Sequence, residues 1–108
     1  MKTELQQGEE IIKKAPANLQ KGIETVGGHL YLTNQRLVFE THSLNVQRGV
    51  TGLYLTNISS TRKCWTKFLG TIPLLPNSLA ICTKQGKEYR FVIFGRTAWA
   101  SAIESRIS

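Results

Sequence analysis

The fold is decided by residues 27–40, which read GGHLYLTNQRLVFE. On both sides of the polar break TNQ, apolar and polar side chains alternate with a period of two, which is typical of half-buried β-strands. Asn34 in the break tolerates the positive φ that a tight hairpin turn requires. The segment therefore predicts a β-hairpin over residues 29–41, whose apolar positions are Leu30, Leu32, Leu37 and Phe39.

The same alternation predicts more strands on both sides of this hairpin. Residues 78–94 read as a second hairpin that turns at KQGK, residues 84–87, while 52–55 and 58–65 read as strands joined at Thr56 and Asn57. Pro16 keeps Ala15 out of helical dihedrals, so we expect any short helix in the first dozen residues to end there. Strands are then expected from Leu19 onward. Six or seven short strands at even spacing predict a mainly β domain, a small sandwich or barrel.

The C-terminal residues follow a helical pattern. Gly95 ends the last strand, and Thr97 is a candidate N-cap for a helix from residue 98 to about residue 107. Trp99, Ile103 and Ile107 recur at i, i+4 and i+8 and form one apolar stripe. A helix of this length is marginal alone. We therefore expect the stripe to pack onto the sheets, with Trp99 filling an open end of the barrel.

Length and composition exclude several classes of protein. The 108 residues, 12.1 kDa, suffice for one domain over residues 1–108, and 41% hydrophobic with 19% charged residues is typical of a soluble globular domain. We expect neither a transmembrane helix nor a signal peptide. Two cysteines are too few for a disulfide scaffold, which favours a cytoplasmic, reducing compartment. The absence of Asp excludes Asp-based triads and EF-hand loops.

The net charge of +7 is unevenly distributed along the chain. Residues 1–45 hold five Lys or Arg against five Glu, whereas residues 46–108 hold nine against two. Such an excess of cations in one part suggests an anionic partner, a membrane surface or a nucleic acid, although solubility alone would explain it equally well.

No residues of the sequence form a recognisable catalytic or metal site. His29 and His42 are the only imidazoles, and we interpret both as structural or surface residues. Cys64 and Cys82 lack the spacing of metal ligands, and we expect them to face each other on neighbouring strands as small core residues. No nucleophile, base and orienting carboxylate can be assembled. We therefore expect no enzyme activity, no catalytic residue, no metal and no cofactor.

Two segments carry a resemblance to a known family. The segment from Gly27 to Glu40 resembles the GRAM-domain hallmark G-x-L-Y-L-T-N-x-R-L-V-F, and QGKEYRFVI at 85–93 and WASAI at 99–103 resemble the way such domains end. The likeness covers about residues 9 to 107 and is similar to the short stand-alone bacterial members. It implies a pleckstrin-homology-like (PH-like) fold, a barrel or sandwich of about seven antiparallel strands in two near-orthogonal sheets, with one C-terminal capping helix.

The resemblance also bears on function. GRAM domains are intracellular lipid-binding or protein-binding modules, which implies a non-catalytic, cytoplasmic binding module in peripheral association with a membrane. Phosphoinositide-binding pleckstrin domains use a Lys followed by a spaced Arg-x-Arg on the first hairpin. Here Asn34 precedes Arg36 by two positions, so that motif is absent and specific inositol-phosphate recognition is not expected.

One basic stretch has the composition of a membrane-contact loop. Residues 62–70, RKCWTKFLG, interleave three cations with Trp and Phe and contain no acid. Such a loop can press its aromatic rings into a lipid interface while its cations meet anionic headgroups. The alternative is a strand with its rings inward and its cations in water. The candidate residues for contact with an anionic lipid or a partner are Arg48, Arg62, Lys63, Trp65, Lys67 and Phe68.

Three hypotheses follow for the partner. The first is weak association with anionic membrane lipid. The second is a protein–protein interaction or self-association module that uses an exposed sheet edge. Nucleic-acid binding is the third and rests on charge alone, because the aromatic residues are too scattered to form a stacking platform. No small-molecule substrate is indicated, and the oligomeric state is left open.

Overall fold

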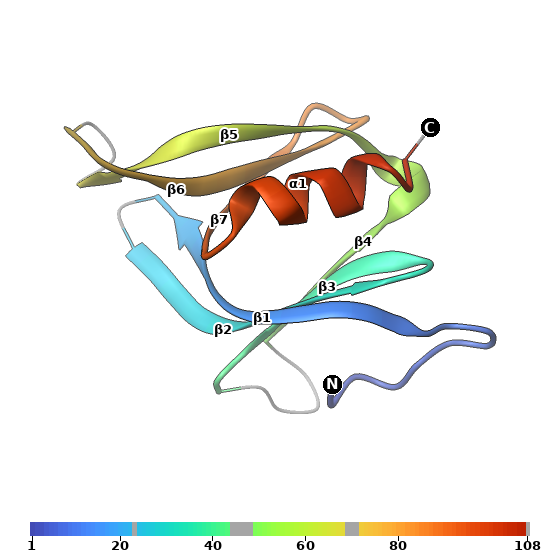
Figure 1. The fold of residues 1–108 in the computed structure, drawn as a ribbon. Coiled ribbons are helices and arrows are strands. Elements are labelled where there is room, and N and C mark those ends of the chain that lie inside the picture. The colour runs from blue at the N-terminus through green and yellow to red at the C-terminus, as the bar shows by residue number, and fades with distance from the viewer. Residues whose placement is uncertain (23, 44–48, 69–71, 108) are drawn as a thin grey trace.

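A computed structural model describes residues 1–22, 24–43, 49–68 and 72–107, apart from the side chains of 65–68 and 72–76. Seven strands are followed by one helix, as the sequence predicts (Figure 1). In chain order the elements are β1 (Ile11–Lys21), β2 (Glu24–Thr33), β3 (Arg36–Thr41), β4 (Val50–Tyr54), a 3-10 turn (Leu55–Asn57), β5 (Ile58–Phe68), β6 (Ile72–Thr83), β7 (Glu88–Ile93) and α1 (Arg96–Glu104).

All seven strands belong to one antiparallel sheet in the order β4-β3-β2-β1-β7-β6-β5. The sheet bends so that β1 to β4 and β5 to β7 lie in two layers, with α1 along one opening between them (Figure 1). We expected two sheets, but pairing between residues 17–20 of β1 and residues 90–93 of β7 joins the layers. Among the described residues, β4 and β5 do not pair, so the sheet is not closed into a barrel.

The first strand is the main feature that the sequence prediction missed. β1 runs through Pro16, where we expected any short N-terminal helix to end. A strand tolerates proline where the missing N–H has no ladder partner. Pro16 occupies such a position, because β7 pairs with β1 only from Ala17 to Gln20. Pro16 therefore has a paired strand on one side only, where it lies opposite His29 of β2.

Both predicted hairpins are confirmed. β2 and β3 pair from Gly28 with Thr41 to Leu32 with Leu37, and β6 and β7 meet around a turn that contains Gly86 at φ 84°. Gly28 is required by close approach, because a Cβ atom there would lie 2.0 Å from the carbonyl oxygen of Glu40. The glycine therefore lets β3 pack against β2.

The helix closes the interior with two fully buried side chains. Trp99 and Ile103 are 1% and 0% exposed, and Ile107 is partly buried, which confirms the predicted stripe. The predicted N-cap is wrong: α1 begins one residue before Thr97, and its N-cap is Gly95 in the left-handed conformation, φ 75°, with no side-chain cap. Glycine adopts this conformation without a steric penalty, so the chain can turn from β7 into α1 at once.

The N-terminal residues form a strap across the outer face of β2 and β3, held mainly by the hallmark segment. The Arg36 Nε donates to Glu9 Oε2 at 2.8 Å, and the Thr33 hydroxyl donates to the same oxygen at 2.7 Å. Asn34 pairs with the backbone of Glu10 through its side-chain oxygen and its N–H. Hydrogen bonds from Arg36 lower the pKa of Glu9 to about 2, although burial acts to raise it. Much of the T-N-Q-R motif therefore serves to fasten the strap.

None of the helices in the described part of the chain has the length and apolar composition of a membrane span.

Replacing Trp99 tests whether α1 completes the core. Trp99→Ala should lower the free energy of unfolding by about 3–5 kcal/mol, because it leaves a cavity between helix and sheet. Phe94→Ala is the matched control, since Phe94 lies five positions away and is 96% exposed, and it should change stability by less than about 0.5 kcal/mol. Urea denaturation measures both. Equal effects of the two variants would show that the helix is not docked through Trp99.

Replacing Glu9 tests the strap. Its pKa is lowered on folding, so the ionised carboxylate stabilises the fold above the unfolded pKa of about 4.5, and this contribution disappears as the pH falls toward 2. Glu9→Gln should lower the free energy of unfolding by roughly 2–3 kcal/mol at pH 7. The difference in this free energy between the variant and the wild type should shrink as the pH falls from 4.5 to 2. Urea denaturation across that range measures the difference. The exposed neighbour Glu10→Gln should cost little, and a Glu9→Gln difference independent of pH would contradict the pairing.

Candidate functional site

Internal contacts occupy most of the acidic side chains, which leaves the lysines without acidic partners. Four of the seven glutamates bind groups within the chain: Glu9 with Arg36, Glu40 with Thr3, Glu88 with Arg62 and Arg90, and Glu104 with Thr61. Among the described side chains, no lysine forms an ion pair. The positive charge that can meet a partner is therefore carried mainly by lysines.

An exposed aromatic ring lies at the junction of β7 and α1. Phe91 and Ile93 point inward on β7, so strand alternation turns Phe94 outward, and the turn at Gly95 follows immediately. The Phe94 side chain is 96% exposed, the highest value among the exposed large hydrophobic residues. Single exposed apolar residues are common, so the surroundings of the ring decide its meaning.

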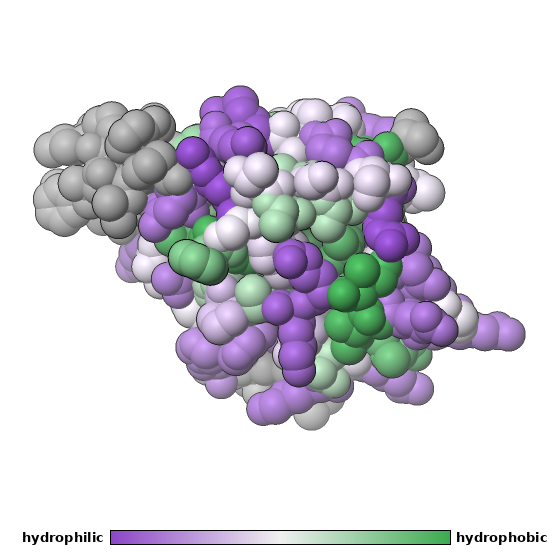
Figure 2. All heavy atoms as spheres, viewed as in Figure 1, coloured by the Kyte–Doolittle hydropathy of each residue, from purple (hydrophilic) through white to green (hydrophobic). Residues whose placement is uncertain are grey.

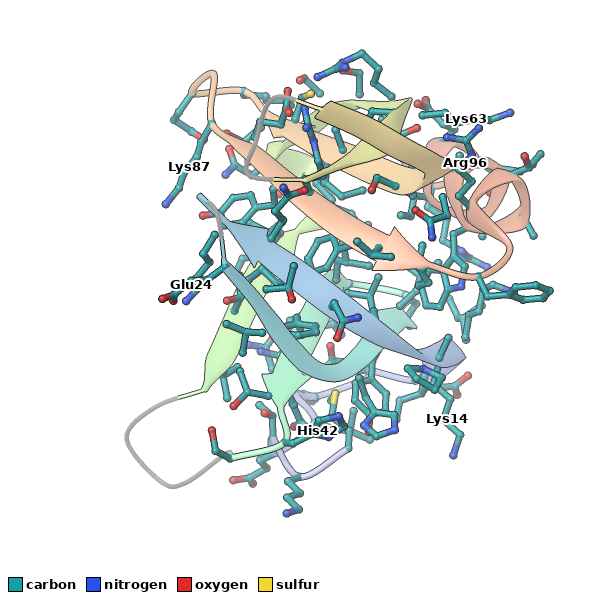
Figure 3. The ribbon with its side chains drawn as sticks, turned by 90° about the vertical axis from the view of Figure 1, so that its left-hand side faces the viewer. Lys14, Glu24, His42, Lys63, Lys87 and Arg96 are labelled. Carbon is teal, nitrogen blue, oxygen red and sulfur yellow. The ribbon has the colours of Figure 1, made fainter. Side chains whose placement is uncertain are left out.

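Cations surround the start of the helix. The Arg96 Nη1 donates to the carbonyl oxygen of Cys64 at 2.7 Å, where the β5–β6 register shifts, and this bond places Arg96 beside Lys63. The Nζ of Lys13 lies 5.4 Å from the centroid of the Trp99 ring, and Lys14 is exposed. Figure 3 shows Lys14, Lys63 and Arg96 on the side of the molecule that carries the helix. We call Lys13, Lys14, Lys63, Phe94 and Arg96 the helix-start face.

Further apolar side chains lie on the same side. A register shift between Ile11 and Lys13 makes Ile12 an extra residue in β1. Ile11 is 39% exposed and Ile12 is 41% exposed. Figure 2, which views the helix side, shows a compact hydrophobic group next to the start of β1. The helix side therefore combines apolar side chains with lysines, as an interfacial surface does.

The opposite side has a different charge balance. Lys21 and Lys87 border an open hollow of about 530 Å³, but Glu88 borders it too. Lys87 also lies 4.9 Å from the centroid of the Tyr89 ring, and Glu24 lies on the same side as Lys87 (Figure 3). Acids beside the lysines reduce the attraction of this side for an anionic surface.

The structure separates the contact residues that the sequence predicts. Arg62 pairs with Glu88 at 2.6 Å, whereas Lys63 points to the opposite face of β5 and lies on the helix-start face. Arg48 lies outside the described residues. Trp65, Lys67 and Phe68 belong to β5, but their side chains are not described. Phe94 was missed, although its position after Ile93 and before Gly95 could have identified it.

The helix covers part of the edge of one outer strand, and the other outer strand is short. Glu104 of α1 accepts hydrogen bonds from the backbone N–H and the hydroxyl of Thr61 on β5, at 2.9 and 2.7 Å. The other outer strand, β4, is five residues long and contains Gly52. Short or covered edges are a common protection against strand addition.

The cysteines do not form a site. Cys64 pairs with Ser78, and Cys82 pairs with Ser60, so the two do not face each other and that prediction is wrong. Cys64 is buried, as predicted, and Cys82 is half-buried. In the described part of the chain, no group of three or more His, Cys, Asp or Glu side chains could hold a metal ion.

Comparison with known proteins places the fold. The model of a family described as "GRAM domain" matches residues 1–104. Among solved structures, the C-terminal domain of an unknown protein from Leishmania infantum aligns with a TM-score of 0.75 and 16% identity, over 93% of this chain and 85% of that one. The Vps36 N-terminal PH domain aligns with a TM-score of 0.67 and 20% identity, over 94% and 84%. No curated protein matches the sequence.

A third similar structure was solved with ligands. The Slm1-PH domain in complex with phosphoserine aligns with a TM-score of 0.67 and 15% identity, over 90% of this chain and 95% of that one. The same domain was also solved with inositol-4-phosphate. At such identities the likeness shows the fold, which is PH-like.

Proposed function

The chain belongs to the GRAM domain family, and on that premise we propose that it is a binding module that attaches weakly to anionic membrane surfaces through its helix-start face. The observation that carries the proposal is the fully exposed Phe94 among cations that form no ion pair within the described part of the chain. Peripheral proteins bind membranes by this combination, with an apolar group in the interface and lysines at the headgroups.

The size of each contribution predicts reversible binding. A lysine or arginine close to an anionic surface contributes about 1 kcal/mol, and burying a phenylalanine contributes roughly 1.5–3 kcal/mol. Lys14 and Lys63 are exposed and can approach headgroups without rearrangement. Trp65, Lys67 and Phe68 follow Lys63 in β5, and we propose that they extend this contact. Arg62 contributes less to the proposed membrane contact, because it already pairs with Glu88. Arg48 lies outside the described residues, and the proposed contact does not depend on it.

The proposed binding is not specific for one headgroup. Specific recognition needs converging donors, for which bidentate arginines are well suited. The first hairpin of the structure is β1–β2, and residues 11–33 contain three lysines and no arginine. Arg36 begins β3, and both its Nε and Nη2 bond to Glu9. Diffuse attraction to any anionic lipid is therefore the better supported mode, although a similar PH domain binds inositol-4-phosphate.

Vesicle binding by matched charge reversals tests this proposal. Co-sedimentation with phosphatidylserine or phosphatidylglycerol vesicles should increase with the anionic fraction and largely disappear by about 0.5 M salt. Lys14→Glu with Lys63→Glu should abolish binding. Lys84→Glu with Lys87→Glu changes the net charge equally, away from the helix-start face, and should retain most of it. Phe94→Ala should weaken binding about tenfold, since the ring no longer enters the interface.

Two results would contradict the proposal. Salt-resistant binding to a single headgroup would indicate a specific pocket, and equal losses in the two double variants would indicate that net charge alone matters. If the wild type does not bind even at low salt, the membrane proposal is wrong and a protein-interaction module is the remaining interpretation.

A further inference from the structure

The two histidines of the chain meet on the outer face of β2 and β3. His29 lies directly across from Glu40 in the ladder, and His42 follows two residues later on the same side. Their ring centroids are 5.5 Å apart, and the rings are nearly perpendicular at 84°. They lie thirteen positions apart in the sequence. No metal-ligand spacing could therefore have indicated the pair.

This separation matches two imidazoles that share one metal ion. Metal–nitrogen bonds of about 2.0–2.1 Å at a tetrahedral angle place the two ring centroids about 5 Å apart. Both rings are exposed and border a hollow of about 330 Å³, which leaves room for an ion and its water ligands. Two imidazoles and water suffice for a simple site, although three protein ligands are more usual.

No protein group competes for the imidazole nitrogens. Within the described residues, no side-chain hydrogen bond or ion pair is formed by His29 or His42. Buried or paired histidines usually have such a partner, whereas ligand histidines must present a free nitrogen. Both rings therefore have a nitrogen available for an ion.

Gly27 positions the second imidazole. A Cβ atom at Gly27 would lie 3.1 Å from Cδ2 and 3.3 Å from Nε2 of His42, and 3.1 Å from the side-chain oxygen of Asn18. Without that Cβ, the Nε2 edge of His42 and the amide of Asn18 come together over the backbone of β2. Asn18 can supply a third, weaker oxygen ligand.

The charges beside the pair are mixed. Lys2 and Met1 with its amine border the same hollow, and so does the Glu40 carboxylate. Lys14 of β1 lies opposite Tyr31, another residue of the hollow.

We propose that His29 and His42 form a binding site for a divalent transition-metal ion, with water and the Asn18 side chain completing the coordination. Neutral imidazoles favour borderline ions, and the order of affinities among these ions makes Cu²⁺ the tightest, above Zn²⁺. A bound ion would join β2 to β3 at the start of the β3–β4 connection. The site is independent of the proposed membrane contact.

Metal titration of protein without a histidine tag tests the site. Calorimetry should show one Zn²⁺ or Cu²⁺ per chain, and the electron paramagnetic resonance spectrum of the Cu²⁺ complex should show coupling to two imidazole nitrogens. His29→Gln and His42→Gln should each weaken binding about tenfold or more, and the double variant should lose the imidazole coupling. Gly27→Ala should also weaken binding, because the new methyl displaces the His42 ring. Thermal melts without metal check that each variant folds.

Controls exclude other ligands. Cys82→Ser removes the half-buried thiol and should leave the affinity unchanged. Unchanged affinity in the double histidine variant would overturn the proposal, because the ion would then bind elsewhere, for instance at the N-terminus. The absence of binding to wild-type protein at millimolar metal would overturn it as well.

Discussion

Burial of Trp99 between the two layers is the constraint on which the rest of the structure depends. The sheet is open, and its interior is closed where α1 places Trp99 and Ile103 over it. To bring Trp99 there, the chain must turn into the helix directly after β7, which the left-handed Gly95 permits. The same turn leaves Phe94 in solvent and brings Arg96 to the β5 backbone. The helix-start face is therefore a consequence of how the core is completed.

The hallmark segment has a structural role that limits its use in binding. Thr33 and Arg36 hold the Glu9 carboxylate, and Asn34 holds the backbone of Glu10. Because Arg36 is engaged in this way, it cannot also serve a headgroup without releasing the strap. Conspicuous residues in a hairpin motif can thus define a fold without defining its ligand. The candidate binding surface lies elsewhere, on residues that carry no motif.

The sequence predicts most of the fold and only part of the candidate site. Alternation of apolar and polar residues identified β2 to β7, and the i, i+4 spacing identified Trp99 and Ile103. β1 was missed because a proline fits in a strand where no neighbouring strand pairs with its backbone nitrogen. Whether β7 pairs with β1 at Pro16 is decided by the whole sheet and not by the residues around Pro16. Lys63 was found by composition. The pair His29 and His42 was not found, because the two residues are brought together by the pairing of β2 with β3. Phe94 was overlooked, although its place after the inward Ile93 could have identified it.

Whether the helix-start face meets the membrane can be measured by paramagnetic relaxation enhancement. Isotope-labelled wild-type protein bound to anionic nanodiscs that contain a spin-labelled lipid would give, for each backbone amide, its proximity to the bilayer. If the helix-start face meets the bilayer, amide signals at 12–14, 63 and 94–97 lose intensity, whereas those at 24 and 84–87 are retained. Loss of intensity centred on 84–87 with retained signals at 94–97 would contradict it.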